Sequence, residues 1–184
     1  MDSEVMELAA SGLRERGVQV ARFEFPYMAQ RRIDQRKRPP DRQPRLLAAF
    51  AEALAQVEDE GAVFIGGKSM GGRVASLVAV QQRVCGCVAL GYPFYAKGKM
   101  DKPRTAHLPG IDAPFIIFQG QRDPLGDATW FAGQKTLHAL NIHWLADADH
   151  DLKPRKVSGF TQQGHITQLA DTLAAFIFQH SASR

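Results

Sequence analysis

The sequence has little cysteine and no long apolar run. Cys85 and Cys87 are the only cysteines among its 184 residues, which argues against a disulfide-stabilised secreted scaffold. No apolar stretch approaches the roughly 18 residues of a membrane-spanning helix. The N-terminal stretch 1–17 is acidic and amphipathic, whereas a secretory signal begins with positive charge and an apolar block. These features predict a cytoplasmic protein without membrane association, and the length fits one domain, 1–184.

Both cysteines fall in the stretch RVCGCVALG, which is typical of a buried strand. Positions i and i+2 of a strand point to the same face, so we expect both thiols in the core. A two-cysteine metal or redox site is the alternative, and C-x-C alone is weak evidence for it. The sequence therefore predicts neither a metal site nor a cofactor.

Positive charge is in modest excess and is concentrated in one segment. The net charge is +4, and the segment 31–45, RRIDQRKRPPDRQPR, is rich in arginine. Nucleic-acid binding is one interpretation, but no aromatic residues interleave with the arginines and no binding motif is visible. A solvated loop is the simpler interpretation. Nucleic acid is therefore disfavoured as a partner.

Helical and strand patterns alternate along the chain. Strands that are apolar on both faces, separated by amphipathic helices, predict a mostly parallel sheet with helices on both faces, an α/β fold. Right-handed crossovers place the strand-to-helix turns at one sheet edge, where ligands bind. The expected strands are 18–25, 61–67, 84–91, 113–120 and 141–147, about five in all, and the expected helices are 3–16, 44–60, 71–83, 128–140 and 165–180.

The stretch FIGGKSMGG joins one of these buried strands to a helix. It contains G-x-S-x-G, in which Gly67 and Gly71 leave room for Ser69 to sit on a sharp turn. The backbone N–H of Met70 could then donate to an oxyanion, because the N-terminus of a helix favours negative charge. The pattern G-x-x-x-x-G-K-[ST] of nucleotide-binding loops is not met. A nucleophilic serine and a plain glycine-rich connection remain the two interpretations.

A serine nucleophile needs a base, and the base needs an orienting carboxylate. In α/β-hydrolases the order along the chain is Ser, then Asp or Glu, then His. Asp123 follows the apolar strand FIIFQG, although it could simply initiate a turn, and nearby Asp127 is typical of a helix cap. His150 follows the last expected strand, although a surface histidine is the alternative. Their order and placement predict a triad of Ser69, Asp123 and His150.

The motifs GGKSMGGR, GYPF…KPRTAHLPGI, FQGQRDPLG and DADHDLKP together resemble the small α/β-hydrolases related to dienelactone hydrolases. The chain is most similar to the bacterial subfamily shared with a testis-expressed eukaryotic homologue, and RFEFPYMAQRR and KRPPDR also resemble it. The resemblance covers nearly all of the chain. It implies an α/β-hydrolase fold with Ser69 as nucleophile, Asp123 as orienting acid and His150 as base. Dienelactone hydrolases proper have cysteine where Ser69 stands, so their substrate is not implied.

The sequence departs from this superfamily at its N-terminus. In the superfamily a strand and an HG-x-G-type loop, which supplies a second oxyanion N–H, precede the first helix. This chain begins MDSEVMELAASG, which looks like the end of that loop and the helix, so the resemblance implies truncation and the lack of the N-terminal strands. We expect either that strand 18–25 closes up against strand 61–67, or that another chain covers the exposed edge, as in a homo-oligomer.

The predicted function is hydrolysis of a small or medium ester, thioester or amide through an acyl-enzyme. The basic segments 31–45 and 92–112 both follow expected strands, so they would flank the site and could favour an anionic acyl substrate. Plain solubility is the alternative explanation of that charge. The rival function is a catalytically weak or inactive hydrolase-like scaffold, which a eukaryotic relative in a chromatin complex suggests.

Overall fold

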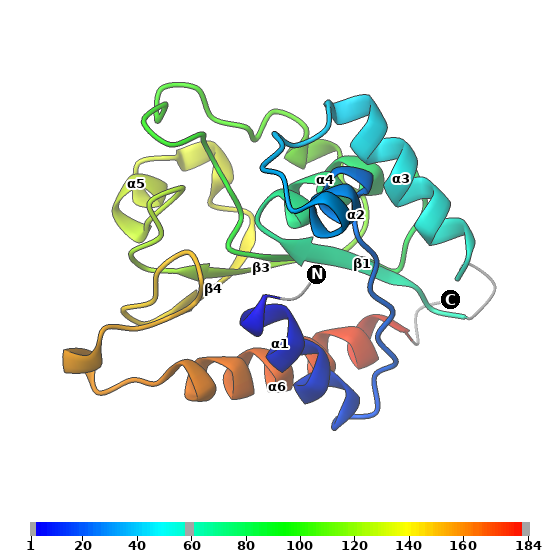
Figure 1. The fold of residues 1–184 in the computed structure, drawn as a ribbon. Helices are drawn as coiled ribbons and strands as arrows, with labels where there is room; N and C mark the ends of the chain where they lie inside the picture. The colour runs from blue at the N-terminus through cyan, green and yellow to red at the C-terminus, as the bar shows by residue number, and fades with distance from the viewer. Residues whose placement is uncertain (1–2, 58–60, 182–184) are drawn as a thin grey trace.

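The computed structural model describes residues 3–57 and 61–181, which build a parallel sheet covered by helices (Figure 1). The sheet has four strands in the order β1-β2-β3-β4, and each neighbouring pair is parallel. The strands are β1 (Phe64–Lys68), β2 (Gly86–Leu90), β3 (Phe115–Gly120) and β4 (Asn141–Leu145). The α/β-hydrolase fold class predicted from the sequence is confirmed, with four strands in the described sheet where about five were expected.

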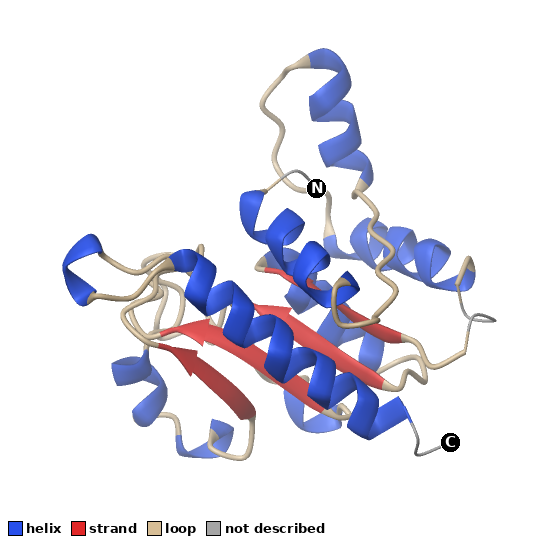
Figure 2. Ribbon diagram, turned by 90° about the horizontal axis from the view of Figure 1, so that it is seen from below, coloured by secondary structure: helices blue, strands red, loops and turns tan. Residues whose placement is uncertain are grey.

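Helices cover both faces of this sheet (Figure 2). On one face α1 and α6 pack together, and side chains such as Ile116 and Phe118 of β3 point toward them. On the other face α3 and α4 pack over β1 and β2, and α5 lies beyond them, with Ile117 pointing to that side. The helices are α1 (Glu4–Arg14), α2 (Pro26–Asp34), α3 (Gln43–Ala55), α4 (Met70–Ala79), α5 (Ala128–Ala132) and α6 (Gln162–Ser181).

Two of the expected helices begin at the capping residue that the sequence predicts, whereas the expected helix 44–60 ends at Ala55 and its last residues, 58–60, lie outside the described part of the chain. The Ser3 side chain accepts a hydrogen bond from the N–H of Met6 at the start of α1, and Gly17 follows its end at φ 79°. Asp127 caps α5 by accepting from the N–H of Trp130 at 2.7 Å. The expected helix 128–140 is shorter than predicted: α5 ends at Ala132, Gly133 is its C-cap, and a 3₁₀ turn, Lys135–Leu137, follows.

The segment 18–25 was expected to be a strand, and this is wrong: it forms no strand, and within 3–57 and 61–181 the one strand that pairs with β1 is β2. Val18 and Val20 pack on the α1–α6 side of the sheet. Phe23 packs edge-to-face on Phe50 of α3, with 5.0 Å between the ring centroids, and Phe25 belongs to the same apolar cluster as Phe50. These anchors hold the segment away from β1, and Figure 1 shows it crossing between the two helical layers. Direct closure of the segment against β1 is therefore wrong, and cover by another chain stays a prediction.

A cavity of about 340 Å³ occupies the space between this segment and the edge of β1. Backbone of β1 forms one wall and α1 another. Its lining is mostly apolar and includes Met6, Ala9, Leu13, Val20, Phe64, Gly66, Gly67, Leu90, Leu173 and Ile177. The cavity thus runs along β1 toward the turn that follows the strand.

Helix α2 was not predicted, since Pro26 was interpreted as the end of a strand. Proline is well suited to the first turn of a helix, because its missing N–H has no partner there in any case. The first part of the basic segment 31–45 is therefore helical. None of the α2 residues is buried, and the helix projects from the rest of the fold in Figure 2.

The cysteines lie in the core, as expected from the strand pattern. Cys85 and Cys87 are buried free thiols, and burial raises the pKa of Cys87 to about 12. Within 3–57 and 61–181, no cluster of three or more histidine, cysteine, aspartate or glutamate side chains could hold a metal ion. No helix in that same part of the chain is both long enough and apolar enough to cross a bilayer.

Candidate active site

Ser69 lies on the sharp turn between β1 and α4, with φ 53° and ψ −118°. A non-glycine residue at positive φ is strained and marks a site held in place by its surroundings. A Cβ at Gly67 would come within 2.8 Å of the backbone carbon of Gly71, so the turn needs glycine there. A Cβ at Gly71 meets nothing within 4 Å, whereas one at Gly72 would lie 2.6 Å from the Gly67 carbonyl. The expectation that Gly71 must be glycine for lack of space is therefore wrong. The residue that must lack a side chain on this side of the turn is Gly72.

The structure brings the three predicted side chains into one hydrogen-bonded chain. Oγ of Ser69 lies 2.8 Å from Nε2 of His150, and Nδ1 of His150 lies 2.8 Å from Oδ2 of Asp123. Both oxygens of Asp123 accept hydrogen bonds, so Nδ1 of His150 carries the proton and Nε2 is free to accept the proton of Ser69. Ser69 follows β1, Asp123 follows β3 and His150 follows β4. The carboxyl ends of these parallel strands lie at the same edge of the sheet.

Asp123 is fully buried and held by two donors besides His150. The N–H of Leu125 donates to Oδ1 at 2.8 Å, and Nε2 of Gln119 donates to Oδ2 at 2.9 Å. Gln119, on β3, is itself fully buried, and its Oε1 accepts from the N–H of Tyr92 at 2.7 Å. Sequence reasoning missed Gln119. Its one signal is an amide near the end of an otherwise apolar strand, FIIFQG.

Replacing Gln119 with leucine is expected to lower both stability and any activity of the site. The change leaves the N–H of Tyr92 and one acceptor position of Asp123 without partners, which costs about 1–3 kcal/mol for each buried group. Urea unfolding should show the loss of stability. Gln134→Ala is the control, because the Gln134 side chain makes one long hydrogen bond within the described part of the chain, from Nε2 to the Trp130 carbonyl at 3.5 Å. Equal unfolding midpoints for Gln119→Leu and Gln134→Ala would contradict this assignment.

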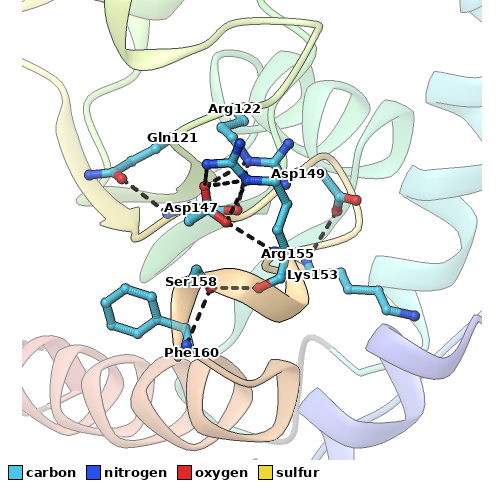
Figure 3. Close-up of polar contacts among 8 residues, drawn as sticks. All are labelled: Gln121, Arg122, Asp147, Asp149, Lys153, Arg155, Ser158 and Phe160. Carbon is cyan, nitrogen blue, oxygen red and sulfur yellow. Dashed lines mark hydrogen bonds and ion pairs between the residues drawn. The ribbon is translucent and has the colours of Figure 1, made fainter.

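The loop that carries His150 is tied to its surroundings on several sides (Figure 3). Asp147 forms ion pairs with Arg155 and with Arg122, and its N–H donates to Oε1 of Gln121. Oδ1 of Asp149 accepts from the N–H groups of residues 151 and 153. The backbone of the loop is therefore fixed by carboxylates on either side of Ala148, and His150 is presented from a rigid turn.

Close packing against glycine fixes the other side of His150. Gly91, directly after β2, has φ 62°, and a Cβ there would lie 2.9 Å from the His150 carbonyl and 3.3 Å from its Nδ1. Any side chain at this position would displace the imidazole from Asp123. The sequence showed only a glycine after an apolar strand, and the reason for it lies about 60 residues away along the chain.

The Asp147 ion pairs give a pH dependence of stability. Hydrogen bonds from Arg155 lower the pKa of Asp147 to about 2, from an ordinary value of 3.8. A carboxylate with a lowered folded-state pKa contributes stability above its unfolded pKa and loses it as the pH falls through the folded value. The difference in unfolding free energy between the wild type and Asp147→Asn should thus be constant above about pH 5 and shrink between pH 3.8 and about 2. Urea unfolding across this range measures it, and a constant difference throughout would contradict the ion-pair assignment.

Met70 begins α4 immediately after Ser69. The first N–H groups of a helix have no partner within it and carry the positive end of its dipole. The carbonyl of Ser69 accepts from the N–H of Arg73 at 3.0 Å, so α4 continues directly from the turn that carries the serine. The predicted oxyanion donor therefore lies beside Ser69, at a helix terminus that favours developing negative charge.

A second serine–histidine contact lies behind the first. Oγ of Ser76 is 2.8 Å from Nε2 of His107, but Ser76 is fully buried on α4. Its hydroxyl proton is directed to the Arg73 carbonyl at 2.8 Å, so His107 donates to Ser76 and cannot act as its base. Burial and the neighbouring Arg73 lower the pKa of His107 to about 4. The contact fastens the loop 92–112 to α4 and has no access to a substrate.

Comparison with known proteins places the chain among α/β-hydrolases. Residues 1–178 match the family described as "Alpha/beta hydrolase domain". Among solved structures, it is similar to a serine hydrolase without a lid from Xanthomonas campestris, with 19% identity and a TM-score of 0.67 over 100% of this chain and 77% of that one. A serine hydrolase homologue from Coxiella burnetii gives 17% identity and a TM-score of 0.66, over 96% and 77% of the two chains. An esterase from Pyrococcus furiosus has 17% sequence identity and a TM-score of 0.64, over 98% of this chain and 77% of that one. At these identities the likeness concerns the fold.

Proposed function

We propose that this chain, which belongs to the alpha/beta hydrolase domain family, is a serine hydrolase that cleaves a small or medium ester, thioester or amide. The observation that carries the proposal is the chain of contacts from Ser69 through His150 to Asp123, with 2.8 Å at each step. The positive φ of Ser69 supports it further, since strained serines on strand-to-helix turns are typical nucleophiles in this fold.

The proposed mechanism is acyl transfer to water. Nε2 of His150 takes the hydroxyl proton as Oγ of Ser69 attacks the carbonyl carbon, and the N–H of Met70 donates to the oxyanion. His150 then gives the proton to the leaving group, whose bond to the carbonyl carbon breaks. Water then attacks the acyl carbon while His150 takes one of its protons. The bond between that carbon and Oγ breaks as His150 gives the proton to Oγ of Ser69, and the acid product leaves. Asp123 keeps the imidazole of His150 in the tautomer with its proton on Nδ1, which these proton transfers require.

An anionic acyl group is the substrate class that the surface charge favours. The lysines and arginine of the loop 92–112 are exposed; they are Lys97, Lys99, Lys102 and Arg104. This loop follows β2, and Gly91 at its start contacts His150. Nη2 of Arg73 contacts Oε1 of Gln43 at 3.5 Å, which brings the end of the second basic segment near the start of α4. Positive charge on both sides of a site raises the local concentration of anions.

The test is hydrolysis of a matched pair of esters, one neutral and one bearing a carboxylate, by the wild type at low and at high salt. We expect turnover of both, with the carboxylate ester preferred at low salt and the preference reduced at high salt. Equal rates at low salt would remove the anionic preference and leave the hydrolase proposal in place. No turnover of any ester or thioester would remove the hydrolase proposal itself.

A binding scaffold is the second candidate function, and one observation favours it. In the described part of the chain β1 pairs with β2 and with no other strand, and the mostly apolar cavity of about 340 Å³ lies along its other edge. Edge strands are ready templates for pairing with another chain. A scaffold would bind a partner at this edge and give no turnover that depends on Ser69, which the ester assay distinguishes.

A further inference from the structure

Lys68 and Asp151, the chain neighbours of Ser69 and His150, form an ion pair of their own. Nζ of Lys68 lies 2.6 Å from Oδ1 of Asp151. The turn that carries the serine and the loop that carries the histidine are therefore joined twice. One link is the hydrogen bond between Ser69 and His150, and the other is this pair beside it.

The two partners are held differently. The Lys68 side chain is only 15% exposed, whereas that of Asp151 is 68% exposed. The backbone of Asp151 is fixed on both sides, because its N–H donates to Asp149 and its carbonyl accepts from Nε2 of Gln162 on α6. The carboxylate thus extends from a rigid backbone to an ammonium group with little freedom to move.

The other side-chain contacts that hold the His150 loop do not reach the turn that carries Ser69. Asp147 is bonded to Arg122 and Arg155, as Figure 3 shows, and neither arginine belongs to the serine turn. Among the residues that the structure describes, the only side-chain polar contacts between 64–70 and 147–155 are the hydrogen bond from Ser69 and the ion pair from Lys68. The relative position of the two loops depends on these two contacts together with apolar packing.

The hydrogen bond between Ser69 and His150 cannot hold the loops together throughout a reaction. Once Oγ carries the acyl group it has lost its proton, and His150 must then activate a water molecule instead. The ion pair is unchanged by these steps. The hydrogen bond from Lys68 lowers the pKa of Asp151, so the carboxylate stays charged at the neutral pH of an ester assay.

We propose that Lys68 and Asp151 are positioning residues, whose ion pair keeps His150 aligned with Ser69 while the serine is acylated. This rests on the proposed hydrolase function. Deacylation depends on the pair more than acylation does, because the direct hydrogen bond is present before acylation and absent after it. Misplacement of a catalytic group by about 1 Å can cost on the order of 100-fold in rate.

The experiment compares Lys68→Met, Asp151→Ala and the double variant on p-nitrophenyl acetate, with both the burst and the steady state followed. We expect kcat to fall roughly 10- to 100-fold in each single variant, with the burst of p-nitrophenol retained and more acyl-enzyme accumulating. The double variant should lose no more than either single variant, because the two residues act as one contact. Lys68→Arg should retain most of the activity.

The matched control is Asp171→Ala. Asp171 pairs with Arg16 at 2.7 Å and its side chain is 64% exposed, close to the exposure of Asp151. This pair joins α6 to the turn that follows α1. This variant should keep the wild-type burst and kcat. Wild-type kinetics in Asp151→Ala would overturn the positioning role, and so would additive losses in the double variant. A loss confined to Lys68→Met would also overturn it, since Lys68 would then act alone on the substrate. If the wild type shows no turnover that depends on Ser69, the proposed function fails first and this inference falls with it.

Discussion

Ser69→Ala is expected to lower kcat for ester hydrolysis by a factor on the order of 10⁴–10⁶, the range seen when a serine hydrolase loses its nucleophile. The variant removes Oγ of Ser69, the proposed nucleophile, while the fold should persist. Alanine at φ 53° keeps the strain that serine already has there. Steady-state kinetics on p-nitrophenyl acetate, with circular dichroism to check folding, measures the effect.

Ser76→Ala is the control for this variant, because Ser76 is the other serine in contact with a histidine. Ser76 is buried and its proton is directed to a backbone carbonyl. We expect a loss of about 1–3 kcal/mol of stability, from the broken buried hydrogen bonds, and kcat within a few-fold of the wild type. Loss of turnover in Ser76→Ala, with turnover kept in Ser69→Ala, would show that the wrong serine has been assigned.

Asp123→Asn is expected to lower kcat by a factor on the order of 10⁴. The two oxygens of Asp123 accept from three donors, which are Leu125 N–H, Gln119 Nε2 and His150 Nδ1. An asparagine must turn its NH₂ group toward one or more of these donors. If the NH₂ group faces His150, the imidazole is driven to the tautomer with its proton on Nε2, which cannot accept the proton of Ser69.

The control for this variant is Asp127→Asn. Asp127 lies four residues along the chain from Asp123, and its side chain caps α5, as its pattern predicts. Asparagine caps helices about as well as aspartate, so kcat and stability should be nearly unchanged. If Asp123→Asn kept more than about a tenth of the wild-type kcat, against the loss typical of a triad aspartate, Asp123 would not be the orienting acid.

The meeting of Ser69, Asp123 and His150 could be predicted because it follows from topology. In a parallel sheet with right-handed crossovers, residues after successive strands meet at one edge, whatever their separation in sequence. The strands before Ser69 and Asp123 are short and mostly free of charged residues, which made them recognisable, while β4 carries Asn141 and His143 among its apolar residues. Only the order of residues and their position after a strand were needed, and both are readable from the sequence.

The segment 18–25 could not be predicted from its pattern, because a strand exists only where another strand can pair with it. Val18 and Val20 alternate with more polar residues, as in a strand. Here these two side chains are buried by packing on the α1–α6 side, and the segment belongs to no sheet. The interpretation of 18–25 as a strand also explains why α2 was not predicted, since Pro26 is compatible both with the end of a strand and with the first turn of a helix. Local pattern alone does not decide between these outcomes.

The residues that position the catalytic side chains through contacts with them could not be predicted from the sequence. Gln119 orients Asp123 only because β3 places it beside the loop after β2, and Gly91 matters only because His150 packs against it. Lys68 was visible as part of the serine motif, but its partner Asp151 is more than 80 positions away. Such pairings depend on register and loop geometry, which become known only with the fold.

The most direct test of the central claim is reaction of the wild type with a fluorophosphonate, followed by intact mass measurement and peptide mapping. Fluorophosphonates phosphonylate a serine whose proton is taken by a neighbouring base, with loss of fluoride. The proposed arrangement predicts one adduct, on the peptide that contains Ser69, and its absence in Ser69→Ala. The adduct should form much more slowly in Asp123→Asn. No adduct on the folded wild type, or an adduct on any other serine, would contradict the claim that Ser69 is the nucleophile of a serine hydrolase.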